Sequence, residues 1–95
     1  MLINKGITAG EVVSIKLISG EEIIARLEED GVDQIKITKP LLVAAGPQGL
    51  GMMPFVFLAE DSTMTVKQSH IIVMAIAKKD AASQYLSGTT GIALR

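Results

Sequence analysis

The sequence predicts an all-β domain, because apolar and polar residues alternate with a period of two through three consecutive runs. The runs lie within residues 12–37, and glycine-containing turns at Ser19-Gly20 and Asp30-Gly31 separate them. Glycine adopts the positive φ of tight hairpin turns without steric cost, and an Asp-Gly pair between alternating runs is a strong hairpin signal. We therefore expect three antiparallel strands that meander through this stretch.

A proline interrupts the alternation after the third run. Because proline has no N–H to donate to a sheet, Lys39-Pro40 predicts a bend or an edge position, after which the apolar run 41–45 resumes. Residues 46–51 are expected to form a loop, since glycine and proline dominate them. The lead-in before residue 12 shows no clear period, and we expect Ile3 or Ile7 to cover one end of the fold.

The second half of the chain predicts further strands and a short helix. Residues 52–58 and 64–67 are expected to be extended, either as one long bent strand or as two short ones. The run 71–77 is apolar on both faces, which is typical of a strand that is central or that lies against another subunit. Asp80 is a suitable cap for a short helix through Leu86, with Gly88 as its C-terminal stop.

Length and composition restrict the class of protein. The 95 residues make a single domain with a thin core, yet 48% of them are hydrophobic and the mean hydropathy is +0.42. We attribute the excess apolar surface to contacts between subunits. No apolar run reaches the ~18–20 residues of a membrane span, and the first residues lack a signal-peptide pattern, so we expect a soluble, cytoplasmic protein.

Charge and residue usage exclude several functions. A net charge of −1 argues against broad, non-specific binding of nucleic acid, which depends on many contacts from lysine and arginine to phosphate. Without cysteine, the chain has no disulfides and no thiolate chemistry. Its single histidine, His70, lacks the partners of a metal site or a catalytic triad, so we expect no enzyme, no metal, no cofactor and no small-molecule substrate.

Two stretches resemble the motifs of Sm and Sm-like (LSm) proteins. Residues 12–37 resemble the first motif, in which a hydrophobic-x-Leu-x-x-Gly hairpin leads to an aspartate, a Met-Asn pair and a closing apolar strand. Residues 64–77 resemble the second motif, in which an apolar residue, a basic residue and a glycine precede the last strand. The long glycine-rich middle and the ending are most similar to small Sm-like proteins of marine cyanophages, which implies a location in the host cytoplasm.

The resemblance implies an Sm-like, SH3-type fold. Residues 1–95 would form a strongly bent five-stranded antiparallel barrel with an enlarged connection between the third and fourth strands and a short C-terminal helix or tail. It also implies a homo-oligomeric ring, in which the fourth strand of one subunit pairs with the fifth strand of the next. The residues expected at this subunit interface are Met64, Val66, Ile71, Val73 and Ala75.

Members of the family bind short single-stranded RNA on the inner rim of the ring. By position, the resemblance makes Gln34 the residue that reads a base edge and Lys67 the cation that lies against a base or a phosphate. Glutamine has the same amide donor and acceptor as the family's asparagine, and lysine supplies a point charge. The remaining rim residues would be Gln68, Ser69 and His70.

Two departures from the family pattern leave the function open. Val32 and Asp33 stand where a stacking side chain is wanted, so the ~1–3 kcal/mol per base from aromatic stacking is missing there, and Asp33 repels phosphate. Gln68 replaces the usual glycine. The first hypothesis is an RNA-binding ring. The second is a structural or protein-interaction ring, such as a phage accessory factor, that has lost the RNA site.

The candidate residues also have purely structural interpretations. Gln34 could be an exposed strand start, Lys67 a solvated lysine before a turn, and His70 a turn-capping histidine. The acidic run 28–30 is expected to be a solvated hairpin tip, because it lacks the ligand spacing of a calcium loop. Phenylalanines at 55 and 57 are expected to lie in the core or in an interface rather than to stack on bases.

Overall fold

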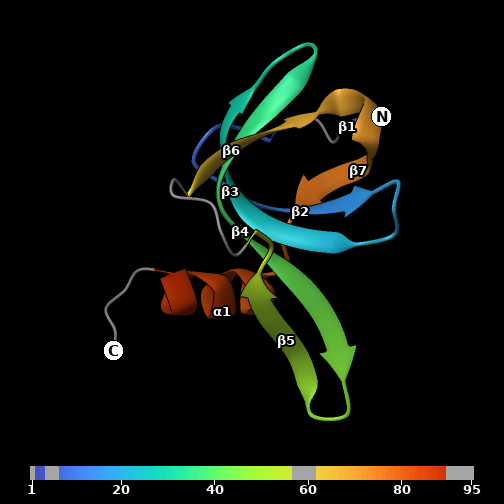
Figure 1. Cartoon of the computed structure of the whole chain (residues 1–95). Coiled ribbons are helices and arrows are strands. Elements are labelled where there is room, and N and C mark those ends of the chain that lie inside the picture. Colours follow the sequence, from blue (N-terminus) through green and yellow to red (C-terminus); the bar gives the residue numbers. More distant parts are fainter. Residues whose placement is uncertain (1, 4–6, 57–61, 90–95) are drawn as a thin grey trace.

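The computed structural model describes residues 2–3, 7–56 and 62–89, which form one sheet and one helix (Figure 1). All statements about the fold refer to these residues. The elements in chain order are β1 (Leu2–Ile3), β2 (Val12–Leu17), β3 (Glu22–Asp30), β4 (Gln34–Gly46), β5 (Gly49–Pro54), β6 (Thr63–Lys67), the 3-10 turn η1 (Gln68–His70), β7 (Ile71–Ile76) and α1 (Lys79–Thr89).

The sheet is open, so the expectation of a closed five-stranded barrel is wrong. Six strands, β2 to β7, pair antiparallel in the order β7-β2-β3-β4-β5, and β6 pairs with the first half of β4. Strand β1 pairs parallel to β7. In the described residues, β6 and β7 share no ladder, and the two edges of β7 are occupied by β2 and β1. The all-β class with a C-terminal helix is confirmed.

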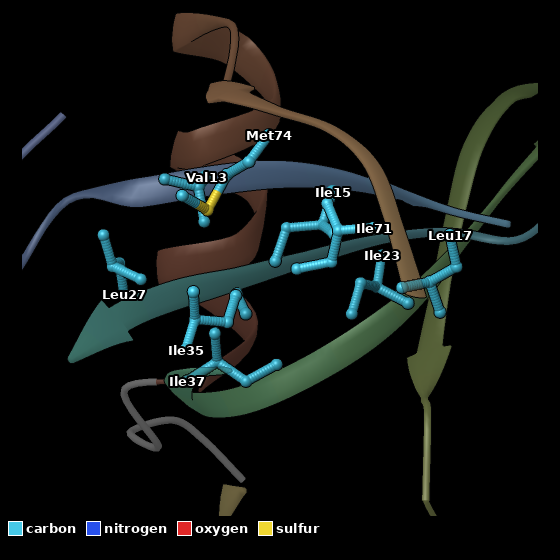
Figure 2. Close-up of a cluster of buried hydrophobic side chains, with 10 residues drawn as sticks. Val13, Ile15, Leu17, Ile23, Leu27, Ile35, Ile37, Ile71 and Met74 are labelled. Carbon is cyan, nitrogen blue, oxygen red and sulfur yellow. The ribbon is translucent and has the colours of Figure 1, made fainter. Parts of the chain in front are cut away.

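The predicted meander forms the centre of the sheet and supplies most of the core. Alternate residues of β2, β3 and β4 point inward and are buried, together with two residues of β7, as Figure 2 shows. Burial of one such aliphatic side chain contributes roughly 1.5–3 kcal/mol. Ile7 packs against this cluster from the lead-in. The cluster consists of Val13, Ile15, Leu17, Ile23, Ala25, Leu27, Ile35, Ile37, Ile71 and Met74.

The two predicted glycine turns are present, but for different reasons. Gly20 has a φ of +104°, as the hairpin prediction requires. Gly31 has no positive φ; instead, a Cβ placed there would lie 2.7 Å from the carbonyl oxygen of Gln34. Glycine is needed at position 31 because the backbone of the next strand approaches too closely for a side chain.

Lys39 and Pro40 make the predicted bend. Both residues lie opposite Ala25 of β3, because the ladder pairs Thr38 with Arg26 and Leu41 with Ile24, which is the two-against-one pattern of a β-bulge. Lys39 adopts a φ of +51° at this point. The bend divides β4 into a first half that pairs with β6 and a second half that pairs with β5.

The expected loop over residues 46–51 is wrong. Strands β4 and β5 form a tight hairpin in which Gly46 pairs with Gly49, so only Pro47-Gln48 are turn residues. Gly49 has a φ of +112°. Glycine and proline dominate this stretch because it is a hairpin tip, and the strands resume at once on either side of it. Figure 1 shows the hairpin extending away from the other strands.

The extended segments 52–58 and 64–67 are two strands. The first belongs to β5, which begins three residues earlier than predicted and ends at Pro54, and the second is β6. Pro54 is tolerated at the end of β5 because its nitrogen points away from β4, so its missing N–H removes no bond of this ladder. Phe57 and residue 58 lie outside the described residues. Strand β7 is central, between β2 and β1, which agrees with one of the two interpretations of its apolar sequence.

The predicted helix is confirmed, with slightly different ends. Helix α1 begins at Lys79, one residue before the expected cap Asp80, and continues through Gly88 to Thr89. The Asp80 carboxylate still accepts a hydrogen bond from the N–H of Ala81 at 2.8 Å. A helix this short needs tertiary contacts, and buried Tyr85 provides them. Within the described ranges, no helix has the length and apolar character needed to cross a lipid bilayer.

Candidate nucleic-acid interface

A groove of about 600 Å³ lies where the β2–β3 turn, β6 and the segment after β5 meet. We call it the β6 groove. Its walls are mostly apolar, and the polar groups are gathered at a few positions. This combination of apolar walls and few polar groups is typical of sites that bind small molecules or nucleotide bases. The lining consists of Leu17, Ile18, Ser19, Gln34, Phe55, Thr65, Val66, Lys67 and His70.

Gln34 and Lys67 are direct neighbours across two strands. Gln34 is the first residue of β4, Lys67 is the last residue of β6, and the antiparallel ladder pairs them. Side chains of directly opposite residues start about 4.5–5.5 Å apart, so an amide and an ammonium group share one end of the groove. Both side chains are exposed and free to meet a ligand. The structure thus brings together the predicted edge-reading residue and the predicted cation.

His70 joins them from the turn η1. Its carbonyl oxygen accepts a hydrogen bond from the N–H of Ile18 at 2.9 Å, which holds η1 against the β2–β3 turn. Its imidazole is exposed and lines the groove. Ser69, the neighbouring predicted rim residue, is exposed but is not part of the groove lining. Three of the five predicted rim residues therefore line the β6 groove.

Gln68 is turned away from the groove and holds two loops together. Its side-chain Nε2 donates to the carbonyl oxygen of Gly31 at 2.7 Å and to Oδ1 of Asp30 at 3.2 Å. Its backbone N–H donates to the carbonyl oxygen of Asp33 at 2.9 Å. A glycine could not make the side-chain bonds, so the departure from the family pattern at this position has a structural role. Gln68 positions η1 beside the 31–33 loop.

Phe55 supplies an aromatic side chain that sequence reasoning did not place at the site. It packs against the hydrophobic core and also lines the β6 groove. It reaches this position because its N–H donates to the carbonyl oxygen of Pro40 at 3.1 Å, at the point where β4 bends. No local pattern in the sequence signals this placement, since it depends on the β4–β5 hairpin returning the chain to the bend.

Two carboxylates line a second hollow next to the groove. This hollow of about 510 Å³ is lined by Glu29, Asp33, Gln34 and Lys36, among others. Lys36 lies 3.7 Å from the carboxylate of Glu29, an exposed ion pair. Val32 is 93% exposed at the tip of the loop. Among the described residues, no group of three or more histidine or acidic side chains is placed to hold a metal ion.

One of the five expected interface residues is buried in the core. Ile71 belongs to the hydrophobic core and is 3% exposed, so its side chain is not available to a neighbouring subunit. Met64, Val66 and Ala75 are half-buried, and Val73 is exposed. The most exposed apolar residues of β7 are Ile72 and Ile76, which sequence reasoning did not select.

Comparison with known proteins identified no relative of this chain. Neither a scan against protein-family models nor a search of the curated proteins found a match for this chain. The likeness to Sm-like proteins therefore depends on the motifs at residues 12–37 and 64–77.

Proposed function

We propose that this protein is a homo-oligomeric, Sm-like protein that binds single-stranded RNA in the β6 groove. The observation that carries the proposal is the convergence of Gln34, Lys67 and His70 with an aromatic ring, Phe55, in one groove. These groups come from β4, η1, the end of β6 and the segment after β5.

The four side chains supply the interactions that recognise an unstacked nucleotide. The face of Phe55 suits base stacking, which contributes roughly 1–3 kcal/mol per base. The amide of Gln34 presents a donor and an acceptor to a base edge, and the ammonium of Lys67 attracts phosphate. Phe55 thereby offsets the missing stacking residue at positions 32 and 33. The neighbouring Ile18 and Val66 keep the floor of the groove apolar.

The open edge of β6 and the exposed apolar side chains of β7 support the oligomeric part of the proposal. In the described residues, β6 pairs with β4 on one edge only, and β7 carries the exposed apolar side chains Ile72 and Ile76. An unpaired edge is a template for strand addition from a second chain. A repeated head-to-tail contact of this kind closes into a ring when its rotation allows.

RNA binding is tested by fluorescence anisotropy with labelled oligo-U and oligo-A at low salt. We expect binding that weakens with salt, and a Lys67→Ala variant whose slope of log K against log salt is shallower by about 0.7, since one phosphate contact is lost. Lys16→Ala is the matched control, because Lys16 is exposed on β2 and lies outside the groove. Absence of binding to either oligonucleotide at low salt would overturn the RNA proposal.

A second candidate function is a protein-interaction ring without RNA binding. The observation in its favour is the acidic character of the neighbouring hollow, where Glu29 and Asp33 lie beside Gln34. Carboxylates at this place repel phosphate and reduce the affinity of the groove for RNA. Light scattering that shows a defined oligomer, together with no anisotropy change for any oligonucleotide, would favour this candidate.

A further inference from the structure

Strand β5 is an edge strand without charged side chains. It lies at the end of the sheet order, and residues 41–56, which contain it, carry no charged side chain. Natural edge strands usually bear lysines or inward-pointing charges that discourage the addition of another strand. Leu50 is 45% exposed and Met53 is 50% exposed. The edge therefore carries exposed apolar side chains and no like-charge repulsion toward a copy of itself, and α1 reaches its backbone at the Leu50 carbonyl.

Two hydrogen bonds reveal which backbone groups of β5 point away from β4. The N–H of Phe55 donates to Pro40 of β4, so the odd-numbered residues face β4. The carbonyl oxygen of Leu50 accepts from Nε2 of Gln84 in α1 at 3.2 Å, so the even-numbered residues face outward. In an antiparallel strand, the N–H and C=O of one residue point to the same side. Leu50, Met52 and Pro54 thus make up the outer edge.

The donors and acceptors of this edge complement each other about a two-fold axis. At Met52 both the N–H and the C=O are directed outward, so two copies can exchange a pair of hydrogen bonds there. Antiparallel pairing centred on Met52 places Leu50 opposite Pro54 of the second copy. The Leu50 N–H then meets the Pro54 C=O. Proline lacks an N–H, but the Leu50 carbonyl needs no donor, because Gln84 already occupies it.

We infer that two copies of this chain associate by antiparallel pairing of their β5 strands, with a two-fold axis at Met52. The same surface serves both subunits, which is the isologous contact that closes at a dimer. The sheets of the two copies become continuous across the contact. This surface is separate from the β6 groove and from the edges of β6 and β7, so the inference goes beyond the proposed function and does not depend on it.

Light scattering on the full chain tests the pairing. Met52→Pro removes the central outward N–H but no hydrogen bond to β4, and we expect it to halve the molar mass relative to the wild type. Met52→Ala is the matched control, because it shortens the same side chain and keeps the N–H, and its mass should equal that of the wild type. A Met52→Pro protein with the mass of the wild type would overturn the inference, as would a wild-type mass of one 10.1 kDa chain.

Disulfide trapping tests the register and does not depend on the folding of the proline variant. The chain contains no cysteine, so a single cysteine introduced by Gly51→Cys or Met53→Cys is the only thiol that can form a disulfide in each protein. Position 51 lies opposite position 53 of the second copy, with Cα atoms about 4.5 Å apart, whereas two copies of position 51 are about 8 Å apart. Disulfides need about 4.4–6.8 Å.

When the two single-cysteine proteins are mixed before mild oxidation, we expect a cross-linked dimer on non-reducing gels. Either protein alone should give at least fivefold less cross-linked dimer than the mixture. Gly51 tolerates the added side chain, since its Cβ would lie 3.7 Å from the carbonyl oxygen of Ala44, an ordinary contact. Equal cross-linking in the mixture and in the separate proteins would overturn the antiparallel register, and no cross-linking in the mixture would overturn the contact.

Discussion

The hydroxyl of Tyr85 lies at the bulge between β3 and β4, where it accepts a hydrogen bond from the backbone N–H of Arg26 at 3.1 Å. The same hydroxyl donates to the carbonyl oxygen of Thr38 at 2.8 Å. Arg26 and Thr38 are paired residues of the two strands, so the hydroxyl bridges backbone groups at the place where the bulge disturbs the ladder. Tyr85 is 1% exposed and attaches α1 to the sheet.

Tyr85→Phe should destabilise the protein by about 1–3 kcal/mol. The ring keeps its packing, but the N–H of Arg26 and the C=O of Thr38 lose their partner in a part-buried site. Urea unfolding followed by circular dichroism measures the change. Ser83→Ala, at an exposed position of the same helix, is the control and should change stability by less than about 0.5 kcal/mol. Equal stability of Tyr85→Phe and wild type would contradict the bridging role.

Stability should fall in alkaline solution partly because of Tyr85. Burial raises the pKa of its hydroxyl above the ordinary value of 10.0, since desolvation disfavours the phenolate. The unfolded chain then releases this proton at lower pH than the folded chain does. The stabilisation from the neutral hydroxyl is complete below pH 10.0 and is lost as the pH rises toward the folded pKa. Unfolding free energies between pH 8 and 11 should fall more steeply for the wild type than for Tyr85→Phe, and parallel curves would refute this assignment.

Gln68→Ala should destabilise the protein by about 1–2 kcal/mol. The substitution removes the bonds that Nε2 donates to Gly31 and Asp30, and only the backbone bond from position 68 to Asp33 still joins η1 to the 31–33 loop. Ser69→Ala is the control, because the neighbouring side chain is exposed. Thermal unfolding measures both variants. If Gln68→Ala and Ser69→Ala had the same unfolding temperature, the side-chain hydrogen bonds of Gln68 would have no energetic role.

Gly31→Ala and Gly88→Ala should have effects of opposite sign. An alanine Cβ at position 31 would lie 2.7 Å from the carbonyl oxygen of Gln34, so the start of β4 must shift, and we expect a loss of about 1–3 kcal/mol. At position 88, inside α1, a Cβ meets open space, and alanine favours the helix by up to about 1 kcal/mol. Urea midpoints that move in the same direction for both variants would contradict this account.

Phe55→Leu should weaken RNA binding about tenfold or more if the groove binds single strands. Leucine keeps the apolar contact with the core but removes the stacking face, which contributes roughly 1–3 kcal/mol per base. Phe55→Tyr retains an aromatic face and should bind within about twofold of the wild type. Anisotropy titrations with the better of oligo-U and oligo-A give the ratio, and a Phe55→Leu protein that binds as the wild type does would exclude stacking on this residue.

The sequence was sufficient to predict the meander β2 to β4, because period-two burial is a local property. Val13, Ile15 and Leu17 face the core for the same reason that Ser14 and Lys16 do not: successive side chains of a strand point to opposite sides. Gly20 needed its positive φ, the bend at Pro40 followed from the missing N–H, and a short helix followed the last strand.

The candidate site was predictable only in part. Gln34, Lys67 and His70 could be placed near one another because the loops of the two motifs lie together in Sm-like proteins, which this sequence resembles. The inward turn of Gln68 could not be predicted, since it depends on carbonyl and carboxylate acceptors 37 and 38 residues away. The β4–β5 hairpin was also missed, because glycine and proline at residues 46–51 suggested a loop, and the barrel was expected from the resemblance alone.

The sequence by itself determined the strand class, the buried face and the turn positions, all of which depend on residues close together along the chain. The tertiary structure determined which distant elements contact the ends of those strands. Arg26 and Tyr85, whose contact attaches the helix, are 59 positions apart in the sequence. Phe55 enters the groove only because the bend at Lys39 aligns β5 with the second half of β4. Contacts of this kind depend on the combined bends and twists of several strands, and a local sequence pattern does not specify that combination.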